Sequence, residues 1–233
     1  MELNYVHPFR LAPRSFKCLQ EQLADQLDIT RPLPLEGVRS CAGVDLAYWK
    51  EGETERGVCS IVVIDNRTHE IMEQTMSIGT IQTPYIPGYL AFRELPLIAE
   101  AAEQLTVTPD VFLFDGNGTL HPRRMGIASH AAFFLNRPTV GVAKSYFKIG
   151  GIDFKMPGNE KGDFTDIRIN GEVTGRALRT AEKVKPVFVS PGNRIDLESA
   201  TQLVLSLVNK DSRLPVPIRL ADLESRRLKR EAK

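Results

Sequence analysis

The sequence predicts an α/β fold with a mixed sheet, in which an antiparallel three-stranded meander is followed by parallel strands and flanked by helices. Two observations lead to this prediction. Short runs of apolar and β-branched residues, separated by turn residues, recur in the first third of the chain and are typical of antiparallel strands. Strand-like and helix-like patterns then alternate, and such alternation indicates crossover connections and parallel pairing.

The chain opens with residues 1–37, which we expect to pack as an arm on the core. Apolar residues at helical spacing predict one amphipathic helix over 15–27. Pro32 and Pro34 end it, because proline supplies no backbone N–H and fixes its own φ.

Changes in the hydrophobic period mark the remaining elements. The turn residues 65–67 separate two strands of the meander, and the segment 153–163, rich in Gly, Pro and charge, is predicted to be a surface loop. In chain order we predict strands over 40–49, 58–65 and 70–78, a helix over 88–105, a strand over 111–114, a helix over 126–135, strands over 139–143, 166–177 and 186–189, and helices over 196–208 and 218–229.

We find no internal repeat, low-complexity tract or interior linker, so we expect residues 1–233 to form a single domain. A meander followed by parallel strands resembles the order of ribonuclease H-like proteins.

Composition excludes some classes of protein. The 30 basic and 29 acidic residues leave a net charge of +1, so any binding of nucleic acid must come from local clusters. Three cysteines without CxxC spacing suggest neither a disulfide framework nor a zinc site, and we expect reduced, mostly buried thiols. No stretch has the length of a membrane span and the N-terminus lacks the pattern of a signal peptide, so we expect a cytoplasmic protein. We also expect it to be a monomer.

Three carboxylates are candidate metal ligands. Asp45 interrupts an apolar strand, where a buried charge is costly unless a cation or hydrogen bonds compensate it. Asp115 follows the strand 111–114, at the edge where α/β sites form, although an aspartate there is often only a turn or cap residue. Glu94 lies in a predicted helix and by itself is a solvated residue. If that helix crosses the meander, Glu94 completes an oxygen-rich site that favours Mg²⁺, with Mn²⁺ as a substitute.

Basic residues follow the Asp115 turn and the next strand. His121, Arg123 and Arg124 form a compact group able to meet a phosphate or assist proton transfer, and a simple basic turn is the alternative interpretation. Lys144 ends the strand 139–143 and is expected at the same sheet edge as Asp115. There it can stabilise charge on a phosphate.

The segment Pro84, Tyr85, Ile86 and Pro87 is a stiff loop, because each proline restrains itself and the residue before it. An exposed Tyr85 and Ile86 suit a wedge that enters a base stack. The alternative is a proline-bracketed turn whose Tyr85 and Ile86 belong to the core.

Several long motifs occur in order from residue 40 onward: GVDLAY, PYIPGYLAFRE, FDGNGTLHPRRMGIASH, TVGVAKS, GRALRT and KPVFVSPGNRID. Together they resemble the endonuclease V family. The resemblance implies a ribonuclease H-like fold and a nuclease that recognises hypoxanthine, the deaminated form of adenine, and cuts the second phosphodiester bond on its 3′ side.

The same resemblance implies roles for individual residues. The metal ligands would be Asp45, Glu94 and Asp115, and His121 and Lys144 would act near the scissile phosphate. Nucleic acid would be bound by Tyr85, Ile86 and Pro87 as the wedge, by Arg123, and by Gly88, Leu90, Gly116 and Ile127 around the flipped base.

The chain departs from the family pattern at Asn117, at Asn193 where His is usual, and at Asp222 where His is frequent. These departures leave the predicted carboxylates intact. Two alternatives remain at this point: another ribonuclease H-like nuclease of the resolvase type, and a nucleic-acid-binding module that has lost its metal. The preference for DNA or for inosine-containing RNA stays open.

Overall fold

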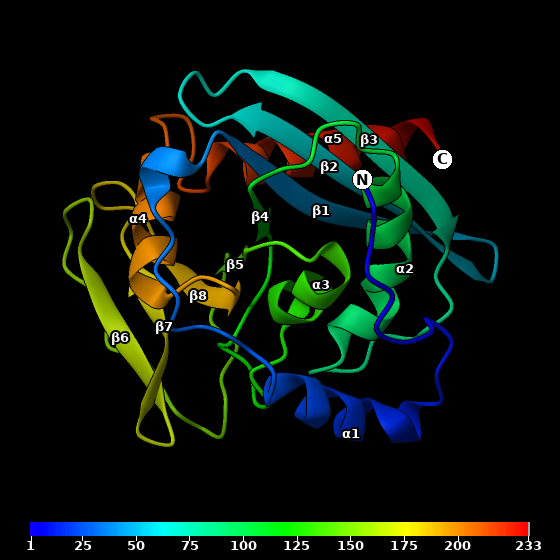
Figure 1. The fold of residues 1–233 in the computed structure, drawn as a ribbon, viewed down its shortest axis with the longest axis horizontal. Helices are drawn as coiled ribbons and strands as arrows, with labels where there is room; N and C mark the ends of the chain where they lie inside the picture. The colour runs from blue at the N-terminus through cyan, green and yellow to red at the C-terminus, as the bar shows by residue number, and fades with distance from the viewer. Residues whose placement is uncertain (233) are drawn as a thin grey trace.

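The computed structural model describes residues 1–232, which form one eight-stranded mixed sheet between two layers of helices (Figure 1). The strand order is β3-β2-β1-β4-β5-β8-β7-β6. The elements are α1 (Pro13–Ala24), η1 (Leu35–Gly37), β1 (Ser40–Glu51), β2 (Thr54–Asp65), β3 (Ile71–Thr80), α2 (Leu90–Glu103), β4 (Val111–Phe114), α3 (Ile127–Leu135), β5 (Thr139–Ala143), β6 (Phe164–Ile169), β7 (Glu172–Leu178), β8 (Val187–Asn193), α4 (Leu197–Ser206) and α5 (Val216–Glu231).

The predicted fold class is confirmed. Strands β1, β2 and β3 pair antiparallel as the meander, and β4 and β5 extend it in parallel on the other side of β1. Helices α2 and α3 pack their apolar side chains on one face of the sheet, and α4 and α5 pack on the other. The sheet therefore lies buried between layers, as parallel strands require.

One strand prediction is wrong. Residues 166–177 do not form a single strand but a hairpin, with β6 and β7 paired antiparallel. Between them Asn170 and Gly171 both have positive φ, the combination that a tight two-residue hairpin turn needs. The remaining predicted strands and helices are present, with ends displaced by a few residues.

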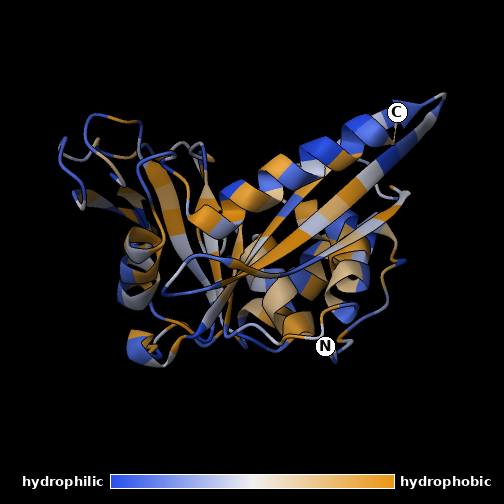
Figure 2. Cartoon of the chain, turned by 90° about the horizontal axis from the view of Figure 1, so that it is seen from above, coloured by the Kyte–Doolittle hydropathy of each residue, from blue (hydrophilic) through white to orange (hydrophobic). Residues whose placement is uncertain are grey.

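Helix α5 lies unusually close to the sheet at its start. A Cβ on Gly43 of β1 would stand 2.1 Å from the backbone carbonyl of Pro217, so only glycine permits this approach. From there α5 runs beside the long β1–β2 hairpin, and its last turns are strongly hydrophilic (Figure 2). The contact fixes which residues of α5 face β1.

Residues of the N-terminal segment pack on the core. Its Met1, Leu3, Val6 and Phe9 cover the cluster beneath α2 and α3. Phe16 of α1 stacks on Phe92 with ring centroids 3.8 Å apart.

A histidine pair fastens this arm to α3. The Nε2 atoms of His7 and His130 lie 2.8 Å apart, and His7 Nδ1 lies 2.8 Å from the carbonyl of Pro8. A carbonyl only accepts, so His7 Nδ1 carries the proton and His130 Nε2 donates to His7. Burial, and then the nearby His7, lower the pKa of His130 to about 3.

We expect the stability of the protein to fall in acid partly because of His130. The pKa of His130 is lower in the folded chain than in the unfolded one, so on acidification the unfolded state takes up a proton first. The free energy of unfolding therefore decreases as the pH falls below about 6.5. The slope approaches roughly 1.4 kcal/mol per pH unit. Denaturant unfolding of wild type and His130→Phe between about pH 7 and about pH 5 measures this contribution as the difference between the two slopes. Parallel curves would contradict it.

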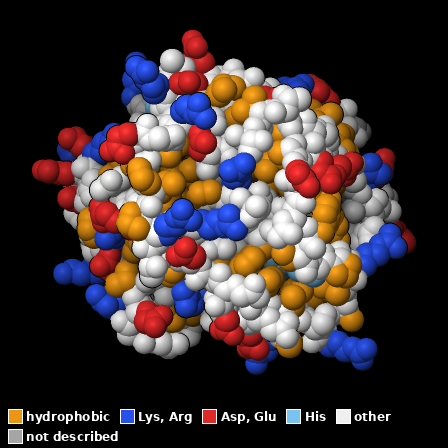
Figure 3. All heavy atoms as spheres, in the orientation of Figure 1, with side chains coloured by type: hydrophobic (Ala, Val, Ile, Leu, Met, Phe, Trp, Pro, Cys, Tyr) orange, Lys and Arg blue, Asp and Glu red, His pale blue; other side chains and the backbone are white. Residues whose placement is uncertain are grey.

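The surface agrees with the balanced composition. On the face seen in Figure 3, basic and acidic side chains are interspersed. Cys18 is exposed and Cys41 and Cys59 are buried, all three as free thiols. Within residues 1–232, no helix is long and apolar enough to cross a membrane.

Candidate active site

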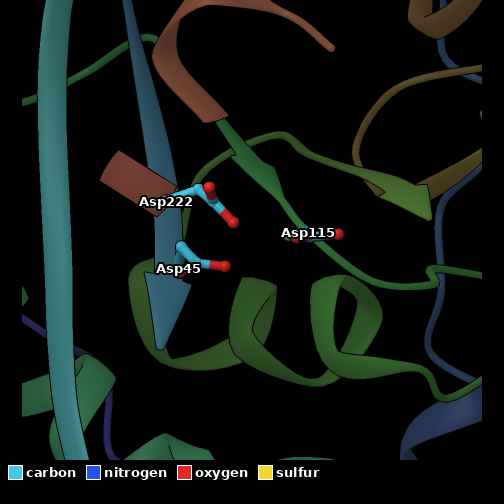
Figure 4. Close-up of side chains that lie close together, drawn as sticks. All are labelled: Asp45, Asp115 and Asp222. Atoms are coloured by element: carbon cyan, nitrogen blue, oxygen red, sulfur yellow. The ribbon is translucent and has the colours of Figure 1, made fainter. Parts of the chain in front are cut away.

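Three aspartates converge at the edge of the sheet where β4 ends. Asp45 comes from β1, Asp115 directly follows β4, and Asp222 comes from α5. One carboxylate oxygen of each lies within 4.8 Å of the others. Figure 4 shows Asp45 and Asp222 pointing toward the strand end that carries Asp115.

The fold explains why these three side chains meet. Val44 and Phe114 are partners in the parallel pairing of β1 and β4, so Asp45 and Asp115 follow at neighbouring positions. The close approach at Gly43 then places Asp222 of α5 over the same point. One helical turn later, Ser225 donates a 2.5 Å hydrogen bond to Asp45 Oδ2.

Lys144 supplies a cation to this cluster. Its Nζ lies 2.5 Å from Asp115 Oδ2 and 2.8 Å from Asp222 Oδ1. The structure thus places Lys144 beside Asp115, as the ends of neighbouring strands predict. Arg226, one turn beyond Asp222 on α5, also bonds to Asp222.

The charges in the cluster are incompletely compensated. The pKa of Asp45 is raised to about 7, chiefly by burial and then by the negative charges of Asp115 and Asp222, while Ser225 and Lys144 oppose this rise. An ionised Asp45 therefore needs more positive charge than Lys144 provides. The donors are carboxylate oxygens without Cys or His, the ligand set that suits a hard divalent cation.

Glu94 lies next to this cluster but does not join the three converging carboxylates. It is buried on α2, and the hydroxyl of Tyr48 donates a hydrogen bond to it. Burial raises the pKa of Glu94 to about 7, with the charges of Asp45 and Asp115 acting in the same direction. The third place that we expected for Glu94 is taken by Asp222, and metal ligation by Glu94 stays a prediction.

Asp222 was missed as a site residue because it stands on an amphipathic helix, where an aspartate usually faces solvent. A signal was present, since the family often has His, another metal ligand, at this position. Asp, like His, is a residue type that can bind a metal ion, and it offers an anionic oxygen in place of a neutral ring nitrogen.

A pocket opens beside Asp115, and all four residues predicted to surround a base line it: Gly88, Leu90, Gly116 and Ile127. Tyr85, predicted as part of the wedge, lines it as well. The rest of the lining, apart from His121, was not predicted: Ala91, Asn117, Met125, Gly126 and Phe147.

Two residues that line the pocket are the first residues of helices. Leu90 is the first residue of α2 and Ile127 the first of α3. The first N–H groups of a helix have no partner within it, so both are free to bind an acceptor.

The loop before α2 is held by its own backbone carbonyl. The oxygen of Gly88 accepts hydrogen bonds from Gln20 Nε2 at 3.2 Å, His121 Nε2 at 3.0 Å and Arg123 Nη2 at 2.9 Å. Gly88 has φ +80°, which other residues rarely adopt. His121 and Arg123 are thus not a free basic turn: both restrain the loop that carries Tyr85.

His121 is neutral in this arrangement. Its Nδ1 accepts from the backbone N–H groups of Arg123 and Met125, so Nε2 carries the proton donated to Gly88. Burial, and then the charge of Arg123, lower the pKa of His121 to about 4. A role of His121 at a phosphate stays a prediction.

The loop 84–87, which we predicted to be a wedge, is exposed. Tyr85 is 63% exposed at the rim of the pocket, Pro87 is also exposed, and Ile86 is half-buried. The alternative in which Tyr85 belongs to the core is therefore wrong.

Comparisons with known proteins agree with this geometry. The family model of endonuclease V matches residues 21–223. Endonuclease V of Bacillus velezensis is 55% identical over 97% of this chain and 95% of its own length, and that of Clostridium acetobutylicum is 52% identical over 99% of both.

Solved structures are also similar to this chain. The crystal structure of the Bacillus subtilis endonuclease V has a TM-score of 0.97 and 51% identity, covering 100% of this chain and 98% of that one. Endonuclease V of Ciona intestinalis, in complex with a 24mer DNA containing an inosine followed by a ribo-adenosine, has a TM-score of 0.82 and 30% identity, covering 94% and 98%. The continuous match in sequence and in structure shows that this chain belongs to the endonuclease V family.

Proposed function

We propose that this protein is a magnesium-dependent repair endonuclease that recognises hypoxanthine in an inosine-containing strand and hydrolyses the second phosphodiester bond on its 3′ side. One observation carries the proposal: the carboxylates of Asp45, Asp115 and Asp222 converge directly beside a pocket with free main-chain donors. The relative from Ciona intestinalis was crystallised with inosine-containing DNA, which supports the same substrate class.

Recognition would rest on the main chain. Deamination replaces the amino donor of adenine by a carbonyl acceptor, which the fixed N–H groups of Leu90 and Ile127 can select. The glycines that line the pocket let the backbone approach the base closely. An inosine pair also costs less to open than a sound pair, which favours extrusion into the pocket.

The carboxylates would hold the divalent ion. Asp45, Asp115 and Asp222 are its ligands in this proposal, and the ion supplies electrostatic stabilisation of the charge that develops on the phosphate. Lys144 adds a donor at the same place. The buried carboxyl of Glu94, oriented by Tyr48, can hold or release a proton close to neutral pH.

A nicking assay tests the proposal. Oligonucleotides with one inosine, labelled at the 5′ end, are incubated with the protein and Mg²⁺, as DNA and as RNA of matched sequence. We expect a labelled product that ends one nucleotide beyond inosine and no cleavage when adenine replaces it. Cleavage that ignores the base, or no cleavage with Mg²⁺ or Mn²⁺, would refute the proposal, and release of free hypoxanthine would indicate a glycosylase.

The wedge makes a separate prediction. Tyr85→Ala should weaken binding to an inosine-containing duplex more than to the single strand, because a wedge mainly offsets the cost of opening stacked bases. Titrations of both substrates measure this ratio. Tyr85→Phe keeps the ring and should retain the preference, whereas equal losses on both substrates would assign Tyr85 a structural role.

A further inference from the structure

Helix α5 has two flanks of different charge on either side of its buried face. The residues facing the sheet include Ile218, Ala221, Ser225 and Leu228. Successive residues of a helix are about 100° apart around its axis, which assigns the remaining charged residues to two flanks. One flank carries Asp222 of the cluster together with four cations, and the other carries one cation between two glutamates. We call the first the basic flank; its cations are Arg219, Arg226, Lys229 and Arg230.

The two flanks also differ in pairing. On the opposite flank Arg227 binds both Glu224 at 2.6 Å and Glu231 at 2.5 Å. On the basic flank only Arg226 has an ion pair, with Asp222, and no acidic group of residues 1–232 lies within ion-pair distance of Arg219, Lys229 or Arg230. The excess of positive charge on the basic flank is therefore not neutralised by the described part of the chain.

A buried atom supports this assignment. Arg219 is half-buried, and its Nη1 is shielded from solvent without any hydrogen-bond acceptor in the described residues. Guanidinium N–H groups out of contact with water are costly when they have no acceptor. An anion beside the helix would compensate the charge of this guanidinium by binding the remaining nitrogens of Arg219.

The basic flank has the reach of a short stretch of nucleic acid. From Asp222 to Arg230 the helix advances roughly 12 Å, which corresponds to about three or four phosphates at the rise of one strand. Asp222 lies on this flank with Arg219 before it and the other three cations after it, so a strand whose phosphate lies at the carboxylates has these cations as its neighbours. On the face drawn in Figure 3, the two signs of charge alternate instead.

We propose that the basic flank of α5 binds the phosphate backbone of the nucleic-acid strand next to the bond that is cut. This inference rests on the proposed function, because it takes the carboxylate cluster as the place of cleavage. The interaction is electrostatic and independent of sequence, and it holds the strand in register while the pocket reads the base.

The salt dependence of binding tests the inference. Removal of one cation that neutralises a phosphate should reduce the slope of log K against log salt by about 0.7 on a single strand. We therefore expect a reduction of roughly 1.4 for Lys229→Gln/Arg230→Gln and about 0.7 for Arg219→Gln, with inosine and adenine strands affected alike. Binding is measured in EDTA, so that the strand stays intact.

The matched control is Arg227→Gln, which removes the same charge from the opposite flank and should leave the slope unchanged. An unchanged slope in the basic-flank variants, or an equal loss in Arg227→Gln, would overturn the inference. An acidic peptide tested in place of the oligonucleotide should not bind. If it binds tightly, and if the basic-flank variants weaken that binding, the flank would instead serve a protein partner.

The two proposals fail in different ways. If inosine strands are not nicked but the slope still depends on the basic flank, the proposed reaction is wrong and the nucleic-acid surface stands. If nicking occurs as proposed but the basic-flank variants leave the salt slope unchanged, the proposed binding surface on α5 is wrong and the proposed function stands.

Discussion

Asp45→Asn is expected to abolish cleavage and at the same time to stabilise the metal-free protein. The loss of activity follows from the loss of an anionic ligand in the cluster of Asp45, Asp115 and Asp222. The gain in stability follows because the pKa of Asp45 is raised in the fold. Below about pH 4 Asp45 is protonated in both the folded and the unfolded state. As the pH rises through 7 the folded state must ionise a buried carboxyl, so at pH 8 the free energy of unfolding of the wild type is lowered by the whole cost of that charge.

We expect a gain on the order of 2 kcal/mol at pH 8, which raises the melting temperature by roughly 4 to 8 °C for a chain of this size. Thermal unfolding in EDTA measures it. Added Mg²⁺ should stabilise the wild type and have little effect on the variant, because an ion that binds only the folded state raises its stability. Asp115→Asn should lose cleavage in the same way.

Asp65→Asn is the matched control. Asp65 ends β2 and accepts hydrogen bonds from the backbone N–H groups of Arg67 and Thr68, which lower its pKa. The same chemical change should therefore leave cleavage intact and bring no gain in melting temperature. A lower melting temperature for Asp45→Asn, or cleavage close to wild type, would contradict the assignment of the cluster.

Lys144→Met should slow the chemical step far more than it weakens binding. Lys144 lies between Asp115 and Asp222, inside the cluster rather than on an open surface. A donor aimed at charge that develops only in the transition state contributes roughly 3 to 4 kcal/mol, so its loss costs about 100-fold to 1000-fold in rate.

Single-turnover nicking at saturating protein, together with the dissociation constant for the inosine strand, separates the two effects. We expect a large fall in the first and little change in the second. A wild-type rate at saturation with weaker binding would instead make Lys144 an electrostatic anchor. Lys144→Arg should recover part of the rate if charge at this position is what matters.

The sequence predicts what depends on strand ends and misses what depends on packing between distant elements. Asp115 and Lys144 follow neighbouring strands, so their meeting at one edge is a consequence of local pattern. Asp222 reaches that edge only because Gly43 admits the start of α5, a contact between residues far apart in the chain. The hydrophobic periodicity of neither segment predicts this contact.

The hairpin of β6 and β7 is a different kind of miss. The pair Asn170-Gly171 is a strong turn signal, and the structure uses it as one. We predicted one strand across this turn because the alternation of apolar residues continues on both sides of it. Glu94 differs from both cases. Its helix does pack on the meander, as the prediction required, but the hydroxyl of Tyr48 binds its carboxylate.

The three hydrogen bonds on the Gly88 carbonyl join parts of the chain that lie far apart in the sequence. Gln20 belongs to the N-terminal helix α1, His121 and Arg123 to the turn after β4, and the carbonyl to the loop that carries Tyr85. Gln20 is therefore connected to this loop without touching the carboxylates. A substitution in α1 can change how firmly the loop is held, and with it the freedom of Tyr85 at the rim of the pocket, while the arrangement of Asp45, Asp115 and Asp222 stays the same.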